Sequence, residues 1–193
     1  MDQEQIEQLV EEAKAGSIEK YGIIIEMLQQ PIFKYCYHML GQREEAEDAV
    51  QEVFIKAYEN LDKYSHTVSF SSWVYKIAYH HCLNLIKRAK SLRVASFLRI
   101  GTPFMSRNEG ELKVDSEYLS EPLHIALSNL SAEERNLIIL RVVEEKGYEE
   151  LSILLNKKTA TLRKQYERAL KKCKHFLHAV EGGGVNEHYS AIR

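Results

Sequence analysis

Apolar residues recur at three- and four-residue steps through most of this chain, the spacing of amphipathic helices. The clearest case runs from about Glu44 to Asn60. Its apolar stripe consists of Ala46, Ala49, Val50, Val53, Phe54, Ala57 and Leu61. Another face of the same helix carries Asp48, Gln51 and Glu52, also at helical spacing. By pattern alone, this polar trio is typical of a solvated helix face.

A second helix is predicted from about Ser72 to Lys90, with Ser71 or Ser72 as its N-cap. Its core side is expected to hold Trp73, Ile77, His81 or Cys82, and Leu85. The positions left for the outside are Lys76, Tyr79, His80, Asn84, Lys87 and Arg88. The loop before this helix, residues 64–70, is rich in hydroxyl and aromatic side chains.

Toward the C-terminus, Ser131 and Glu134 have the spacing of a capping box at the start of a helix. Gly147 is expected to end that helix in a left-handed conformation. A short helix, 149–155, then a turn, 156–158, and a long basic helix, 159–178, complete the pattern. The apolar side of the long helix consists of Leu162, Tyr166, Ala169, Leu170, Cys173, Phe176 and Leu177.

Helical patterning therefore predicts an all-α chain with two small helical domains, at residues 1–95 and 122–180. Between them, residues 96–121 have weak periodicity and contain Gly101, Pro103 and Gly110, which predicts a flexible linker. Residues 181–193 include three consecutive glycines and are expected to be a disordered tail.

Composition and cysteine spacing indicate the type of protein and its cellular compartment. With 193 residues and 45% hydrophobic content, the chain has the balance of a folded soluble protein. Cys36, Cys82 and Cys173 form no CxxC pair, which favours buried free thiols in a reducing compartment. The polar start is not a signal peptide, and no apolar run is long enough to enter a membrane. These features together predict a cytoplasmic protein.

The net charge of −2 conceals segregated blocks of charge. Acidic residues gather at 44–52, whereas basic residues dominate 87–99 and 157–174. Such segregation indicates partners of both signs. The chain holds no nucleophile motif and no phosphate-binding glycine loop, so neither catalysis nor a cofactor is expected. His80 and His81 are adjacent and point to different helix faces, which disfavours a shared metal ion.

A short helix, a tight turn and a long basic helix form the outline of a DNA-binding helix-turn-helix. Thr159, Thr161, Arg163 and Lys164 occupy the first turns, where a recognition helix reaches base edges. Lys157, Lys158, Arg168 and Lys171 suit phosphate contacts. On this outline alone, a basic amphipathic helix in an ordinary bundle remains an alternative.

The order of these features adds a resemblance. The stretch AEDAVQEVFIKAYENLDKYSHTVSFSSWVYKIAYHHCLNLIKR resembles region 2 of extracytoplasmic-function (ECF) sigma factors, in the sigma-70 family of RNA polymerase sigma factors. Residues 121–177 resemble region 4, through the motif L-S-x-x-E-R, then G-Y-x-E, then a T-hydrophobic start to the last helix. Two motif sets in this order are more specific than either alone.

The resemblance implies a role for each set of residues. Asp48, Gln51 and Glu52 would dock on the β′ clamp helices of the polymerase core, and region 4 would meet the β flap. The specificity loop, which captures a flipped minus-ten base, would be formed by Tyr64, Ser65, His66, Ser69 and Phe70. The outer face of the following helix would grip the opening strand through Lys76, Tyr79, His80, Asn84, Lys87 and Arg88. The minus-thirty-five element would be read by Lys158, Thr159, Thr161, Arg163, Lys164 and Arg168.

Some positions depart from the family pattern. His80 and Asn84 stand where Asn and Asp are usual, and Ala160 replaces a common Gly. Lys158 replaces the usual Ser or Thr cap of the last helix, unless Thr159 takes that role with a one-residue shift. These changes leave the fold intact and alter the expected base preference.

Sigma factors of this class typically have an anti-sigma partner, often membrane-anchored, and the resemblance implies one here. Two other functions compete. A conventional helix-turn-helix regulator would bind duplex operator DNA without polymerase. A sigma-sequestering protein would use its helices to block partners and would not need the basic recognition helix.

Overall fold

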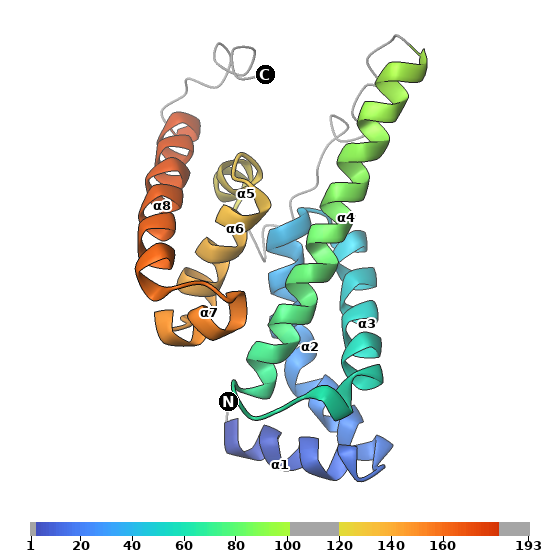
Figure 1. Ribbon diagram of the computed structural model, residues 1–193. Helices are drawn as coiled ribbons and strands as arrows, with labels where there is room; N and C mark the ends of the chain where they lie inside the picture. Colours follow the sequence, from blue (N-terminus) through green and yellow to red (C-terminus); the bar gives the residue numbers. More distant parts are fainter. Residues whose placement is uncertain (1–2, 101–119, 182–193) are drawn as a thin grey trace. The chain divides into compact units, whose positions relative to one another are not determined.

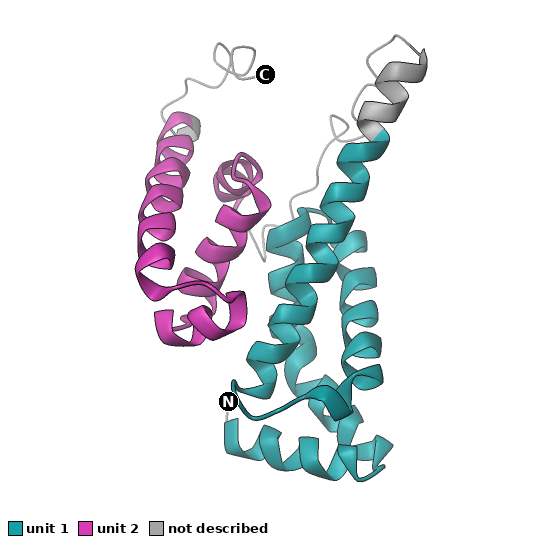
Figure 2. Cartoon of the chain, viewed as in Figure 1, with its two compact units in different colours: residues 1–112 teal, residues 113–193 magenta. Residues whose placement is uncertain are grey.

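The computed structural model describes residues 3–100 and 120–181, with side chains up to Leu92 and from Ser120 to Ala179. Every regular element in these ranges is a helix, which confirms the predicted all-α class. The chain forms two compact units, residues 1–112 and 113–193 (Figure 2).

Unit 1 is a bundle of four α-helices (Figure 1). They are α1 (Gln3–Lys14), α2 (Ile18–Leu40), α3 (Arg43–Glu59) and α4 (Phe70–Ile100), with a short 3-10 turn, η1 (Leu61–Lys63), after α3. Helices α2, α3 and α4 pack on one another, and α1 packs against α2 and α4. The largest fully buried side chains include Tyr35, Tyr37, Phe70, Ile24, Leu28 and Ile32. Burying one Leu, Ile or Phe side chain contributes about 1.5–3 kcal/mol.

The apolar stripe predicted on α3 is confirmed, since Ala46, Ala49, Val53, Phe54 and Ala57 are buried. The α3 helix is tied to α2 by the buried Tyr21 hydroxyl, which donates to the Phe54 carbonyl at 2.6 Å. This bond fixes the rotation of α3 and so decides which of its faces meets solvent.

The start and the core face of α4 differ from the prediction. Its N-cap is Ser69, whose Oγ accepts the Ser72 N–H at 3.2 Å, so the helix begins two residues earlier than expected. The core side is formed by Phe70, Val74, Tyr75, Ala78 and Cys82. Of the expected core residues, Cys82 is buried, whereas Trp73, Ile77, His81 and Leu85 are only half-buried. Small and polar residues share the true core face, and that hid it from the periodicity.

Unit 2 contains α5 (Glu121–Ser128), α6 (Ala132–Ile138), a π-helical turn η2 (Ile139–Val143), α7 (Tyr148–Leu155) and α8 (Thr159–Glu181). Helix α8 packs against α5, α6 and α7, with Leu162, Ala169 and Cys173 buried. The Arg135 guanidinium donates to the Leu127 carbonyl at 2.9 Å and to the Ser128 carbonyl at 3.2 Å. It thereby satisfies carbonyls at the end of α5 and fixes the α5–α6 turn.

The predicted capping box is confirmed: Ser131 Oγ accepts the Glu134 N–H, and Glu134 Oε2 accepts the Ser131 N–H. Gly147 does not end the preceding helix; it has φ −68° and serves as the N-cap of α7. The left-handed residue of that connection is Glu145, with φ 52°. Pro122 lies in the first turn of α5, where its missing N–H has no helical acceptor in any case.

The N-cap position of α8 is occupied by a lysine. The Lys158 carbonyl accepts the Leu162 N–H at 3.0 Å, so Lys158 occupies the N-cap position and Thr159 is already helical. The alternative of a one-residue shift to a Thr159 cap does not occur, and the helix starts at Thr159 as predicted. The turn before α8 is made by Asn156, which is left-handed at φ 50°.

The predicted linker is partly helical, because its first residues, 96–100, continue α4. The rest of that segment, 101–119, and the predicted tail, 182–193, lie outside the described residues.

Candidate binding surfaces

The exposed side of α3 is an acidic stripe formed by Asp48, Gln51 and Glu52. All three side chains face solvent because the opposite side of the helix is buried in unit 1. Glu52 forms an ion pair of 3.5 Å with Lys56, one turn along the helix. The stripe is thus an accessible, rigidly held negative surface.

Sequence reasoning missed an apolar member of this surface. Ile55 is 53% exposed and follows Glu52 by three residues and Gln51 by four. Tyr58, three residues further, is 44% exposed. The signal was present in the sequence, since Ile55 falls off the apolar stripe of its own helix. Apolar side chains beside charged ones are typical of protein-binding surfaces.

The loop between η1 and α4, residues 64–70, is supported by packing between aromatic rings. The Tyr64 ring centroid lies 5.1 Å from that of Phe70 and 5.4 Å from that of Trp73. Tyr64 and Phe70 are buried, whereas Ser65, His66 and Thr67 are exposed and Ser69 is half-buried. Two of the five predicted DNA contacts, Tyr64 and Phe70, therefore support the loop instead of forming its outer surface.

Helix α1 supplies further partners for this loop that the sequence did not reveal. His66 Nδ1 lies 3.0 Å from Glu7 Oε2, and His66 Nε2 lies 3.1 Å from Glu11 Oε1. The Tyr64 hydroxyl is 2.8 Å from Glu7 Oε2, and burial raises the pKa of Tyr64 well above its ordinary value. These contacts join residues more than fifty positions apart in the chain, so no local motif could announce them.

The outer face of α4 is basic and partly aromatic. Lys76, His80, Asn84, Lys87 and Arg88 are exposed and recur at helical spacing, and Tyr79 is half-buried. The Tyr79 and His80 rings lie 5.2 Å apart. Partial burial, with the nearby charges of Lys76 and Lys87, lowers the pKa of His80. The lowered pKa favours the neutral imidazole, which can both donate and accept a hydrogen bond.

The first turns of α8 present the predicted recognition residues. Lys158, Thr161, Arg163, Lys164 and Arg168 are exposed, and Thr159 is half-buried. The Arg163 guanidinium lies over the Tyr148 ring of α7, 5.1 Å from its centroid. Arg141 covers the same ring at 4.6 Å, and the Tyr166 ring at 5.9 Å. Tyr148, the tyrosine of the G-Y-x-E motif, and Arg141, which the sequence did not single out, thus shape the surface around Arg163.

Within the described ranges, no group of three or more His, Cys, Asp or Glu side chains is arranged to hold a metal ion. None of the helices in residues 3–100 and 120–181 combines the length and apolar character of a membrane span. The three cysteines are buried free thiols, as predicted.

Comparison with known families places both units. Residues 24–92 match Sigma-70 region 2, and residues 120–173 match Sigma-70, region 4. The two matches fall in the same order as the two units. Together they define a protein of the sigma-70 class.

Among curated proteins, the chain is 29% identical over 171 residues to the ECF RNA polymerase sigma factor SigW of Bacillus subtilis, covering 84% of this chain and 91% of SigW. It is 24% identical over 177 residues to the RNA polymerase sigma-H factor of Pseudomonas aeruginosa, covering 88% and 92% of the two chains. The chain therefore belongs to the sigma-70 family, as an ECF-type RNA polymerase sigma factor.

Solved structures share the fold. The sigma factor RpoE from Bartonella quintana, solved with the anti-sigma factor NepR, aligns with a TM-score of 0.63 and 17% identity, covering 88% of this chain and 100% of that one. CnrH, solved with the cytosolic domain of CnrY, aligns with a TM-score of 0.65 and 19% identity, covering 92% and 99%.

Proposed function

We propose that this protein binds the RNA polymerase core and directs it to specific promoters by recognising and melting promoter DNA. The observation that carries the proposal is the acidic stripe of α3, which is exposed in the same unit as the basic, aromatic face of α4. One small bundle then has one surface for polymerase and another for DNA. This activity needs no catalytic residue and no cofactor, so we propose that the protein is not an enzyme.

On polymerase, Asp48, Gln51 and Glu52 would meet the β′ clamp helices, with Ile55 adding an apolar contact. Complementary charge steers such an encounter and fixes its orientation. Unit 2 would lie at the β flap.

On the minus-ten element, Lys76, Lys87 and Arg88 would follow the backbone of the single strand while Tyr79 and His80 stack on bases. The exposed residues Ser65 and His66, with the half-buried Ser69, would line the pocket for an extruded base. Extrusion costs a few kcal/mol of stacking, which hydrogen bonds and ring contacts in a pocket offset.

On the minus-thirty-five element, the N-terminal turns of α8 would enter the major groove. The exposed Arg163 and Lys164 would donate to base edges, helped by Thr159 and Thr161. Lys158 and Arg168 would contact phosphates. The first turn of α8 also offers free N–H groups to a phosphate.

An anti-sigma factor is proposed as a further partner, because the two solved relatives described above were each captured with another protein, for RpoE the anti-sigma factor NepR. It would keep the polymerase- and DNA-binding surfaces covered until a signal releases them, and a membrane anchor on that partner would link it to signals at the cell surface. Polymerase and promoter DNA place the proposed activity in the cytoplasm.

The test is reconstitution. Purified protein is mixed with sigma-free core, the complex is captured, and run-off transcription is measured on a library of promoters. We expect core binding and RNA starts at defined sites that depend on both promoter elements. Tight binding to duplex DNA without core would instead identify a conventional helix-turn-helix regulator. Core or sigma binding with no RNA starts would identify a sequestering protein.

A further inference from the structure

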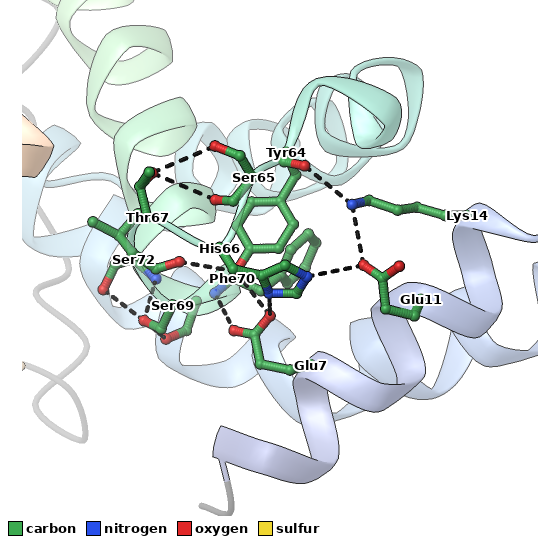
Figure 3. A network of polar contacts seen from close by, with 12 residues as sticks. Glu7, Glu11, Lys14, Tyr64, Ser65, His66, Thr67, Ser69, Phe70 and Ser72 are labelled. Atoms are coloured by element: carbon green, nitrogen blue, oxygen red, sulfur yellow. Dashed lines mark hydrogen bonds and ion pairs between the residues drawn. The ribbon is translucent and has the colours of Figure 1, made fainter.

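We propose that Glu7 and Glu11 of α1 are positioning residues that set the shape, and hence the base preference, of the loop at residues 64–70. The inference rests on the proposed function, because it assigns new residues to the minus-ten pocket. Neither side chain belongs to the loop, and both reach it from helix α1 (Figure 3).

Glu7 connects the two ends of the loop. Its Oε1 accepts the Phe70 backbone N–H at 2.8 Å, and its Oε2 lies 2.8 Å from the Tyr64 hydroxyl. Phe70 is the first residue of α4, so its N–H has no acceptor within the helix. A carboxylate at a helix N-terminus is also favoured by the helix dipole. Glu7 therefore holds the loop and the start of α4 with one side chain.

Glu11 and Lys14 extend this support by one helical turn. Glu11 Oε1 lies 3.1 Å from His66 Nε2, and Lys14 Nζ donates to the Tyr64 carbonyl at 3.0 Å. Lys14 also pairs with Glu11 at 3.1 Å. Residues 7, 11 and 14 share one face of α1. Because Ile6, Leu9, Val10 and Ala13 are buried on the adjacent face, α1 is held in place beside the loop.

The imidazole of His66 is held between the two acidic side chains. With Nδ1 at 3.0 Å from Glu7 and Nε2 at 3.1 Å from Glu11, each ring nitrogen faces a carboxylate oxygen. The ring is thus fixed in orientation although the side chain is exposed. A group fixed by a supporting shell can discriminate between bases, whereas a loose one tolerates several.

Loss of Glu7 or Glu11 is expected to change promoter specificity more than it changes binding to polymerase. The acidic stripe of α3 contains none of these residues, so its affinity for core should survive their loss. A displacement of about 1 Å in a recognition group is enough to weaken selection strongly. Glu7 and Glu11 would therefore act on promoter choice through loop geometry.

The experiment compares Glu7→Ala, Glu7→Gln and Glu11→Ala in the full chain. Gln8→Ala, an exposed position on the same helix, and Glu26→Ala, an exposed carboxylate on α2, serve as controls. The first readout is hydrogen exchange of the backbone amides of residues 65–70. The second is the ratio of run-off transcription from a preferred promoter to that from promoters with single substitutions in the minus-ten element, at saturating core.

We expect Glu7→Ala to speed exchange of the Phe70 amide and to lower the promoter ratio about tenfold, the size of one base contact. In Glu7→Gln the amide oxygen can still accept the Phe70 N–H, but the amide nitrogen cannot accept from the Tyr64 hydroxyl. Its effect should therefore be smaller than that of Glu7→Ala. Glu11 is exposed, so Glu11→Ala should fold normally and still lower the ratio. Both controls should match the wild type, and affinity for core should be unchanged throughout.

Unchanged exchange in both Glu7→Ala and Glu11→Ala would overturn the inference, whatever the protein does in transcription. Faster exchange with an unchanged promoter ratio would overturn the role in base preference. If the wild-type protein started no RNA chains with core, the proposed function would be refuted, and so would the role of Glu7 and Glu11 in base preference. In that event, the exchange measurement would still decide whether Glu7 orders the loop.

Discussion

The Arg163 guanidinium of α8 stacks over the Tyr148 ring of α7, with 5.1 Å between its central carbon and the ring centroid. The same ring is covered by Arg141 at 4.6 Å. A cation over an aromatic face is attracted by the negative face of the ring. The Arg163 side chain is therefore held in place in the free protein, and less of its freedom would be lost in the proposed contact with DNA.

Under the proposed function, Tyr148 would position Arg163 for reading the minus-thirty-five element. Tyr148→Leu keeps an apolar side chain but removes the aromatic face that holds Arg163. A cation–π contact at an exposed site contributes about 0.5–1 kcal/mol. We therefore expect the preference for an intact over a scrambled minus-thirty-five element to fall about two- to fivefold, as measured by run-off transcription. Phe176→Leu, further along α8, is the matched control, and equal ratios in both variants and the wild type would refute this role.

Charge reversal on α3 should weaken binding to polymerase. Asp48→Lys places a cation in the exposed acidic stripe without touching a buried side chain. Like charges brought together in an interface are repulsive, and we expect affinity for core to fall about tenfold or more. A fluorescence titration with labelled core measures this, and circular dichroism checks that the helices remain. Asp62→Lys, an exposed acid in η1, is the control, and an equal effect from both reversals would argue for long-range charge alone.

The helices were largely predictable from the sequence because their apolar residues recur at helical spacing. The α3 stripe and the Ser131–Glu134 capping box are local signals, and both were confirmed. The start of α8 at Thr159 was predicted in the same way. Features of this kind depend on neighbours within one or two turns, which the sequence displays directly.

The supports of the loop and of Arg163 could not be found in this way. Glu7 reaches Tyr64 and Phe70 across more than fifty residues, and nothing in the polar first helix marks it out. Tyr64 and Phe70 were expected at the DNA, yet aromatic rings at a loop can equally pack inward, and these do. Tertiary packing decided between two uses of the same residue type.

The buried thiols should be slow to react. A hydrogen bond with Cys82, together with burial, raises the pKa of Cys36 well above its ordinary value, and burial raises the pKa of Cys173. Because these pKa values are raised, few molecules carry the thiolate at pH 8. The thiolate is the reactive form, so reaction should be slow. We expect all three cysteines to react with a disulfide reagent only in denaturant. Rapid modification of Cys36 or Cys173 in the native protein would contradict this packing.

The capping box of α6 should make unit 2 sensitive to acid. Burial raises the pKa of Glu134, but hydrogen bonds from the Ser131 N–H and the Lys172 ammonium together lower it by more. The pKa therefore lies below its ordinary value of 4.5. Lys172 Nζ is 3.1 Å from Glu134 Oε2. A carboxyl whose pKa is lowered by folding stabilises the folded state above its unfolded pKa. That stabilisation is lost as the pH falls through the lower, folded value.

Two substitutions separate the parts of this cap. Ser131→Ala should cost about 1 kcal/mol at neutral pH, because the Glu134 N–H loses its acceptor. Glu134→Gln should flatten the loss of stability below pH 4.5, since it has no charge to lose. Hydrogen exchange of the α6 amides at pH 7 and in acid reports both effects on unit 2. Glu133→Gln, one residue earlier and exposed, is the matched control. If both glutamine variants kept the acid sensitivity of the wild type, the source would have to lie outside the cap.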